Sequence, residues 1–515
     1  MKRIKIYLTA ALILMLMFLS PSCTKDFEEL NTNPNSPGLS QAAPEMLLTN
    51  AIESMTDRVH EIFFGHEMGS CWAQHMAKVQ YTDEDRYIPR IAVINNTWNS
   101  FYAASGNDVQ TLYNIAFERN SPSYQGVALI LKSYIMSVLT DEFGDAPYSE
   151  AFMGTADEPI VSPAYDTQEF IYAALLANLD EANTLLTGAS DVEGDILFDG
   201  DVMMWRKFGN TLRLRLLLRR SDRVDPTADM TTIVGNPATY PIIEGNDEDV
   251  ELQYLGSAPN NNPINENRKT RDDHRVSATL VDMMWNSGAI EPDYRLMAYA
   301  EVAASTGDYV GIPNGLLSAV ALGYLGNGLA ETSKIGRYFE EATAPGVLIS
   351  YSELQFILAE AAHLDFIPGG DGDAKTYYTE GISSSYYKYT HEIEIGIEEY
   401  YGTPPGAYLV DDMLEWYLAD GGWGYSPANA MEQICTQRWF AMFGQGVQAA
   451  FEWRRTGFPD LLPGADNANG DKIPVRCYYP SDEHARNPTN VDAAIAIQGA
   501  DDLDTRVWWD IADNY

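Results

Sequence analysis

The chain has 515 residues, of which 74 are acidic and 33 are basic, so its formal net charge at pH 7 is −41. A surface this acidic repels phosphate backbones and anionic headgroups within the Debye length, and we therefore expect no nucleic-acid partner. Hydrophobic residues make up 45% of the chain, which is enough to bury a large core in one big domain or two closely packed ones.

The first residues follow the order of an export signal: three basic residues, an apolar run over residues 6–19, and small residues just before Cys23. The run is shorter than the ~20 residues that a helix needs to cross a bilayer, so the pattern predicts a cleaved signal peptide over residues 1–22. Cleavage would leave Cys23 as the first residue, where acyl chains such as palmitate would hold the protein on a membrane surface. Ordinary secretion with an incidental cysteine is the alternative.

Residues 24–44 are polar and contain Asn-Pro and Ser-Pro steps that interrupt regular structure. We expect residues 23–44 to form a lipidated tether in front of one folded region, residues 45–515. The signal peptide carries three positive charges and no negative ones, so the mature chain has a net charge of −44. Within the folded region the best candidate for a membrane span, residues 127–139, is too short and contains Lys132.

Apolar residues recur at helical spacing through the folded region and predict a mostly α-helical chain. Residues 225–275, which are rich in Asn and Pro, are predicted to form an extended loop region, and residues 454–515 an irregular aromatic cover. The last two of the predicted helices follow each other across a Pro-Gly-Gly turn and form a pair of about the tetratricopeptide length, ~34 residues. The predicted helices span residues 47–55, 72–79, 124–139, 170–186, 201–220, 351–364 and 373–389.

Three arginines of the predicted helix 201–220 lie seven residues apart and nearly in line: Arg206, Arg213 and Arg220. In so acidic a protein we interpret them as partners in ion pairs with neighbouring Asp and Glu residues. An anion-binding site is the alternative.

The sequence contains none of the common catalytic patterns, such as HExxH, GxSxG or the phosphate-binding GxxxxGK[ST]. His60, His66 and His75 lie close together in sequence, but a spacing of six residues does not place the first two on one helical face. We interpret all three as core or surface histidines rather than metal ligands.

Two acidic stretches resemble calcium loops, one with Asp371 and Asp373 and the other over residues 467–471. Both lack the glycine at position six and the glutamate at position twelve of such loops, so we expect no cofactor, and structural calcium is an unsupported alternative. The odd number of cysteines after Cys23, without CxxC spacing, predicts neither a disulfide framework nor a zinc site. One pair with one free thiol stays open among Cys71, Cys435 and Cys477.

Aromatic residues are abundant, with 10 Trp and 31 Tyr, and many stand in loop-like sequence contexts. Flat rings stack on the C–H faces of sugars, while nearby polar side chains hydrogen-bond to hydroxyl groups. We hypothesise that two or three rings share one exposed glycan site; core filling is the alternative for each of them. The candidate ligand-binding residues are Tyr81, Tyr87, Trp98, Trp285, Tyr309 and Trp423.

Several stretches together resemble motifs of the SusD/RagB family, in the order expected for it and over nearly the whole chain. They are CTKDFEELNTNPN (23–35), FGDAPYSEAF (143–152), DGDVMMWRKFGNTLRLRLLLR (199–219), YSELQFILAEAA (351–362), FEWRRTGFPDL (451–461), KIPVRCYYPSDEHARNP (472–488) and DTRVWWD (504–510).

The resemblance implies a mostly α-helical fold in which four tetratricopeptide-like helix pairs form a right-handed helical scaffold packed against an irregular, loop-rich half. It implies a lipoprotein of the outer membrane that faces the cell exterior, and Lys25 and Asp26 resemble the family's signal for that placement, although Phe27 interrupts the acidic run. It also implies a non-enzymatic lid that captures a glycan and delivers it to a SusC-like TonB-dependent transporter. The family's ligand residues do not carry over to positions of this sequence.

Three functions stay open at this point. The first is nutrient capture, with a glycan as the ligand or, as in a RagB-like lid, a peptide. The second is an exported glycan hydrolase, which would release products from a polysaccharide. The third is a helical-repeat scaffold, which would bind no small ligand.

Overall fold

The computed structural model describes residues 42–154, 158–288, 292–402, 409–420 and 422–511. The chain divides into two compact units, Met1–Ala43 and Pro44–Tyr515. The predicted signal peptide, Cys23 and nearly all of the predicted tether lie outside the described residues, so these three predictions stay predictions. Everything below concerns the second unit.

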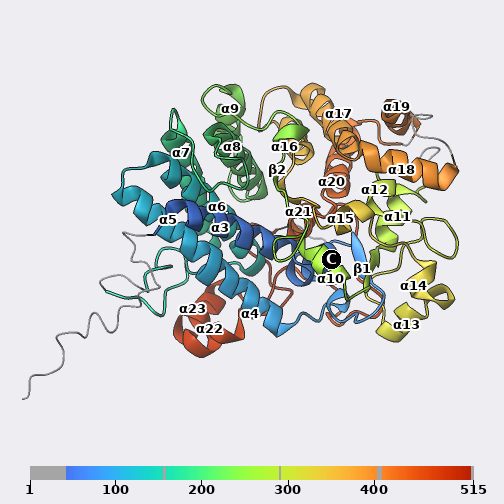
Figure 1. Cartoon of the computed structure of the whole chain (residues 1–515), viewed down its shortest axis with the longest axis horizontal. Coiled ribbons are helices and arrows are strands. Elements are labelled where there is room, and N and C mark those ends of the chain that lie inside the picture. The colour runs from blue at the N-terminus through green and yellow to red at the C-terminus, as the bar shows by residue number, and fades with distance from the viewer. Residues whose placement is uncertain (1–41, 155–157, 289–291, 403–408, 421, 512–515) are drawn as a thin grey trace, which may run out of the picture. The chain divides into compact units, whose positions relative to one another are not determined.

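Helices dominate the unit Pro44–Tyr515 (Figure 1). The first group of α-helices comprises α3 (Pro44–His60), α4 (Ile91–Asn99), α5 (Asn107–Glu118), α6 (Pro122–Phe143), α7 (Gln168–Leu186), α8 (Val202–Arg219), α9 (Thr227–Gly235), α10 (Pro263–Arg268), α11 (Ala278–Met284), α12 (Leu296–Tyr299), α13 (Ser318–Leu322), α14 (Gly328–Glu331) and α15 (Arg337–Glu340). The second comprises α16 (Tyr351–His363), α17 (Gly370–Lys388), α18 (Thr390–Tyr401), α19 (Val410–Asp420), α20 (Ala430–Ala441), α21 (Val447–Thr456), α22 (Ser481–Arg486) and α23 (Pro488–Gln498).

Two small antiparallel sheets are the only ones in the described part of the chain. One pairs β1 (Met76–Lys78) with β3 (His274–Val276), and the other pairs β2 (Val250–Leu252) with β4 (Gly346–Ile349). Short helical turns of other types complete the elements: the π-helical η1 (Ile62–Ser70) and η3 (Ser100–Gly106), and the 3₁₀ turns η2 (Glu84–Arg86), η4 (Asn246–Glu248), η5 (Tyr324–Gly326) and η6 (Pro427–Asn429).

Local sequence explains the ends of the helices that were predicted. Asp201 caps α8, because its side chain accepts hydrogen bonds from the first backbone N–H groups of that helix. Helix α6 has Pro122 in its first turn and ends at Gly144, whose positive φ of 83° turns the chain away. Helix α6 is also buried on nearly every side, which accounts for its long apolar run. No helix of the described residues is long and apolar enough to cross a membrane.

Three sequence predictions are wrong. Residues 72–79 do not form a helix; they contain a turn and the fully buried strand β1, and burial on both faces of the strand explains why apolar residues occur here without a helix. Residues 225–275 are not one extended loop, since they contain α9, β2, α10 and the start of β3. The closing segment 454–515 contains α22 and α23 besides its irregular parts.

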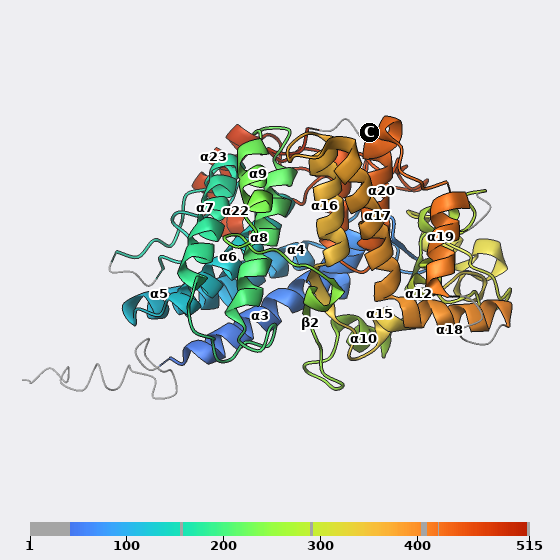
Figure 2. The same ribbon diagram turned by 90° about the horizontal axis from the view of Figure 1, so that it is seen from above.

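The helices are arranged in a row of packed groups. In both views α5–α8 lie at one end, α12, α18 and α19 lie at the other, and α16 and α17 lie between them (Figures 1 and 2). Consecutive helices pack on each other within these groups, α6 on α7, α7 on α8 and α16 on α17. The packing of α16 on α17 confirms the helix pair predicted over residues 351–389.

A buried ionic network joins α6, α8, α16, α20 and α21. Arg219 of α8 pairs with Asp141 of α6 and Glu452 of α21, each at 2.6 Å. Glu353 of α16 accepts from Arg215 and Arg438. The network uses arginines of α8 other than the three predicted in line. Of those three, Arg213 pairs with Asp180 and Asp229, whereas Arg206 donates to Asn183 and the Thr239 carbonyl.

The three neighbouring histidines all lie in the interior, which fits their interpretation as core residues. Burial lowers the pKa of His60 to about 4, and of His66 and His75 to about 3 each. Cys71, Cys435 and Cys477 are buried too, and none of them forms a disulfide.

The folded chain should therefore lose stability as His66 becomes protonated in the unfolded chain. Between pH 6.5 and about 3 the unfolded state binds a proton at His66 that the folded state does not, so this residue makes the free energy of unfolding fall as the pH falls. Buried carboxyls act in the opposite sense, since burial raises the pKa of Asp85 to about 6 and of Glu142 to about 7. We therefore expect the free energy of unfolding of His66→Gln to fall less steeply than that of the wild type as the pH is lowered. Urea unfolding at pH 4.5, 5.5, 6.5 and 7.5 measures this dependence for both chains. Parallel profiles for the two chains would contradict the assignment.

Candidate functional site

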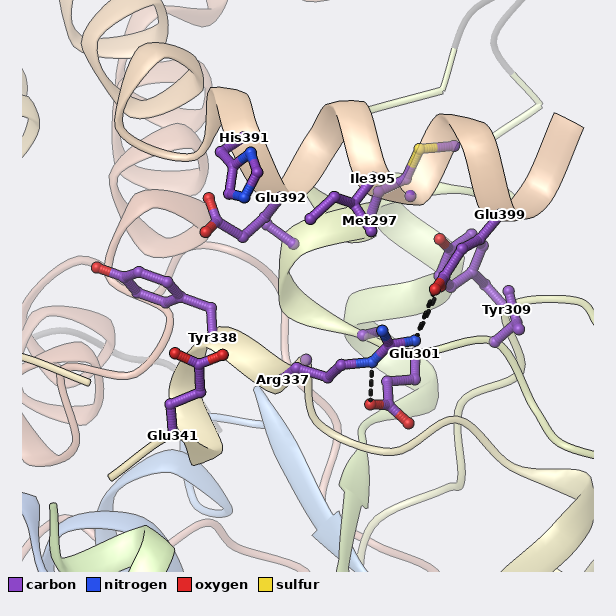
Figure 3. A pocket seen from close by; sticks show the side chains of 15 residues that line it. Met297, Glu301, Tyr309, Arg337, Tyr338, Glu341, His391, Glu392, Ile395 and Glu399 are labelled. Carbon is purple, nitrogen blue, oxygen red and sulfur yellow. Dashed lines mark hydrogen bonds and ion pairs between the residues drawn. The ribbon is translucent and has the colours of Figure 1, made fainter. Parts of the chain in front are cut away.

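A cavity of about 290 Å³ lies where α12, α15 and α18 meet. Figure 3 shows its side chains, which come from three separate stretches of the sequence. The lining residues are Met297, Ala298, Ala300, Glu301, Val302, Tyr309, Gly336, Arg337, Tyr338, Glu341, His391, Glu392, Ile395, Gly396 and Glu399.

One stripe of α18 forms a wall of this cavity. The lining positions of the helix run from His391 to Glu399 and recur at intervals of three and four residues, which keeps them on one side of it. Gly396 lets α18 approach α12 closely, because a Cβ atom at this position would lie 2.5 Å from the Cβ atom of Met297. A side chain here would push the two helices apart and widen the cavity.

Arg337 of α15 joins two carboxylates on one side of the cavity. Its Nε atom lies 3.0 Å from Glu301, which follows α12, and its Nη2 atom lies 2.8 Å from Glu399 of α18 (Figure 3). The arginine side chain is 61% exposed, so each ion pair adds little to stability. The contacts orient these three polar groups at the mouth of the cavity.

Tyr309 connects the cavity to a cluster of aromatic rings. Its ring centroid lies 4.8 Å from that of Trp285 and 5.5 Å from that of Tyr400, and the last two rings are 5.4 Å apart. Tyr400 donates a hydrogen bond to Asp308 at 3.0 Å, which fixes its ring. Trp285 and Tyr400 are half-buried, so part of each ring faces solvent beside the cavity.

The cavity therefore combines aromatic surface with carboxylates, one guanidinium and tyrosine hydroxyls. Such a set binds polyhydroxylated molecules, since rings cover apolar C–H faces while charged groups accept from or donate to hydroxyl groups. Among the described residues, no group of three or more His, Cys, Asp or Glu side chains could hold a metal ion. This applies also to the two calcium-like stretches that the sequence suggested.

The six predicted rings do not gather at one place. Trp285 and Tyr309 meet at the cavity, as the hypothesis of a shared site expects. Tyr81 is exposed elsewhere, under the guanidinium group of Arg271, 4.5 Å from its ring centroid.

Two of the predicted rings are buried, contrary to the loop-like contexts that suggested them. Tyr87 is buried after η2, and Trp98 lies in helix α4, packed at 5.1 Å on Phe143 and at 6.3 Å on Tyr479. For these two residues core filling is the better description, because no face of either ring is available to a ligand in this conformation.

Trp423 lies beside a different hollow, an open groove of about 820 Å³ between α17 and α19. The neighbouring Gly424 and Tyr425 line this groove, and Tyr387 on its rim donates to Asp411 at 2.6 Å. The residues that line the groove are Lys375, Thr379, Ser383, Tyr387, Asp411, Leu414, Glu415, Leu418, Ala419, Gly424 and Tyr425.

Sequence reasoning did not identify most of the cavity. Glu392 and Glu399 stand seven residues apart in a run that ends in Tyr400 and Tyr401, and this stripe of acidic and aromatic residues is visible in the sequence. It carried no weight there because 74 acidic residues make such spacings common. Arg337 gave no local signal, since its two partners lie 36 and 62 residues away.

Comparison with known proteins places these observations in a family. A SusD-like family model, described as starch-binding and associating with the outer membrane, matches residues 34–480. A comparison with curated protein sequences found no match.

Solved structures resemble this chain over most of its length. One is of a chitin-binding protein, with 26% identity and a TM-score of 0.77, covering 91% of this chain and 100% of that one. Another is of a SusD homologue from Bacteroides fragilis, with 25% identity, a TM-score of 0.73, and 91% and 99% coverage. A chitin-binding SusD homologue from Flavobacterium johnsoniae has 21% identity, a TM-score of 0.72, and 91% and 100% coverage. These likenesses confirm the mostly helical fold that the sequence predicted.

Proposed function

Because the chain belongs to the SusD-like family of starch-binding proteins that associate with the outer membrane, we propose that it captures a glycan at the cell surface and delivers it to a SusC-like TonB-dependent transporter. The ligand site is the cavity between α12, α15 and α18, together with the ring cluster beside it. The chain acts as a binding protein and not as an enzyme.

The observation that carries this proposal is the position of Trp285, Tyr309 and Tyr400. Three rings with centroids 4.8 to 5.5 Å apart lie at the Tyr309 side of a cavity whose other walls combine carboxylates and a guanidinium group with apolar side chains. A sugar has apolar faces and hydroxylated edges, and this arrangement offers a complementary surface to each of them. The 26% identity to a chitin-binding protein supports a glycan as the ligand.

Delivery to a transporter follows from differential affinity. A ligand that both the lid and the transporter contact favours the closed complex, and it can shift that equilibrium only by its difference in affinity for the closed and open states. The cavity mouth, with the exposed Arg337 between Glu301 and Glu399, offers polar groups that a transporter-bound sugar could contact.

The test is a binding panel with the purified mature chain from residue 24 onward. We expect its migration to be retarded in native gels that contain the cognate polysaccharide, tried with starch and glycol chitin, and we expect no reducing sugar to be released from either. Product release would identify a hydrolase. Retention by oligopeptides instead of glycans would identify a RagB-like peptide lid, and no binding at all would favour a scaffold.

Membrane attachment through Cys23 is part of the same proposal. We expect Cys23→Ala to move the processed protein from the outer-membrane fraction to the soluble fraction of salt-washed cells, because the acyl chains supply the membrane affinity. Protease added to intact cells should digest the wild-type protein if it faces the exterior. A variant that still sediments with the membrane after the salt wash would contradict a lipid anchor.

A further inference from the structure

The cavity has a strong excess of negative charge. Four carboxylates line it, those of Glu301, Glu341, Glu392 and Glu399, and Arg337 is the only Lys or Arg among the lining residues. Carboxylates gathered in a concave site create a negative potential there that attracts cations and repels anions. The charge of the cavity can therefore select among glycans that share the same shape.

The guanidinium group of Arg337 neutralises only part of this charge. It contacts Glu301 and Glu399, both on the same side of the cavity. Glu341 and Glu392 form no ion pair with any described residue, and Figure 3 shows their carboxylates above and below Tyr338 in that view. Two unpaired carboxylates beside one aromatic ring suit a cation, which would contact the oxygens and the face of the ring together.

Tyr309 gives a second and independent indication of a ligand. Only 5% of this residue is exposed, it lines the cavity, and its hydroxyl group has no hydrogen-bond partner among the described residues. A hydroxyl group that lines a cavity and has no partner in the protein can bond to a molecule held there without breaking an existing contact. In Figure 3 the ring projects toward α18 beside Glu399, where a ligand in the cavity can reach it.

We infer that the cavity prefers glycans that carry an ammonium group, namely the glucosamine units of partly deacetylated chitin, over fully acetylated or acidic ones. The ammonium group lies between Glu341 and Glu392, and the Tyr309 hydroxyl bonds to the sugar. This inference rests on the proposed glycan-binding function and specifies its substrate class. An acetamide group keeps the shape of the sugar residue but removes the charge, while a carboxylated sugar meets like charge.

The test uses chitosan hexamer, N-acetylchitohexaose and a galacturonate hexamer as probes in calorimetric titrations of the mature chain at pH 6. At low salt we expect chitosan hexamer to bind at least about tenfold more tightly than N-acetylchitohexaose, and galacturonate to show no binding. At 0.5 M NaCl the difference should shrink, because salt screens the interaction at exposed carboxylates. Equal affinities of the two chitin-derived hexamers would overturn the inference.

The variant Glu341→Gln/Glu392→Gln tests whether a preference for chitosan comes from the cavity or from the negative charge of the whole chain. Both substitutions keep the side-chain shape and remove the two charges, so we expect chitosan affinity to fall at least about tenfold more than N-acetylchitohexaose affinity does. Glu398→Gln is the matched control, since this residue lies on α18 but does not line the cavity. Equal losses in the control and the double variant would mean nonspecific attraction and would overturn the inference. Unchanged thermal unfolding of both variants shows that folding is intact.

The outcomes also distinguish this inference from the function on which it rests. Binding of neutral glycans without any preference for the amine keeps the proposed function and overturns the inference. Absence of binding to every sugar overturns both. Oligolysine is tested as a competitor for the same cavity. If it binds as strongly as chitosan and loses this affinity in the same double variant, the cavity binds basic peptides and the glycan class is overturned.

Discussion

Glu452→Gln is expected to lower the free energy of unfolding by about 3–5 kcal/mol. Glu452 is buried and contacts Arg219 at 2.6 Å, Arg438 at 2.9 Å and Arg455 at 3.1 Å. Burial raises the pKa of Glu452, but the three guanidinium groups outweigh it and hold the pKa well below its usual range. A neutral amide leaves these buried positive charges without enough negative partners.

The charge balance of the network explains the size of this effect. Four guanidinium groups meet four carboxylates in it: Arg215, Arg219, Arg438 and Arg455 with Asp141, Glu353, Glu360 and Glu452. Removing one carboxylate from a closed set of buried charges exposes the full desolvation cost of its partners. Because α6, α8, α16, α20 and α21 all contribute a member, the loss weakens the packing of these helices on one another.

Urea unfolding at pH 7, followed by far-UV circular dichroism, measures the change. Glu432→Gln on α20 is the matched control, since Glu432 is exposed and should change the free energy of unfolding by no more than about 0.5 kcal/mol. The stability that Glu452 contributes is present above the unfolded-state pKa of 4.5 and is lost as the pH falls toward its depressed folded-state pKa. The wild type and the variant should therefore converge in acid. A variant as stable as the control would show that the network does not hold the helices together.

Trp285→Ala is expected to weaken glycan binding by at least about tenfold, which corresponds to about 1.4 kcal/mol. The ring of Trp285 packs edge-to-face on both Tyr309 and Tyr400 and is half-exposed at the cavity. Its loss would remove stacking area and also free the other two rings to move. Most of the effect should appear in affinity rather than in the number of sites, which calorimetry reports separately.

Phe117→Ala is the control for this change. Phe117 is a large aromatic residue that is 64% exposed on α5, at the far end of the row of helices from α12 and α18 (Figure 1). Its removal should leave glycan affinity unchanged. Affinity retained by the Trp285 variant, or lost equally in both variants, would remove the ring cluster from the binding site.

Helices were predicted well from the sequence where apolar residues recur at helical spacing over many residues. The predictions were correct for α3, α6, α7, α8, α16 and α17. A long periodic segment can be recognised from its own sequence, without knowledge of its partners in the fold. Strand β1 could not be predicted in this way. It has three residues and exists because β3 pairs with it, with Lys78 opposite His274 almost 200 residues away.

The candidate site was harder to predict than the fold, for a related reason. Trp98 follows an Asn-rich stretch that resembles a loop, yet its burial depends on Phe143 and Tyr479, which come from distant parts of the chain. Trp285 and Tyr309 could be selected as aromatic candidates, but nothing local joined them to Arg337 or to the acidic stripe of α18. A cavity assembled from three separate segments becomes visible only when the tertiary structure brings them together.

The most direct test of the account is a crystal structure of the mature chain with the oligosaccharide that the binding panel identifies. We predict electron density for a sugar ring stacked on Trp285 or Tyr400, with its hydroxyl groups directed toward Tyr309 and Glu399. Density at another place, such as the groove between α17 and α19, with the cavity beside Tyr309 unoccupied, would contradict the central claim that this cavity is the glycan site.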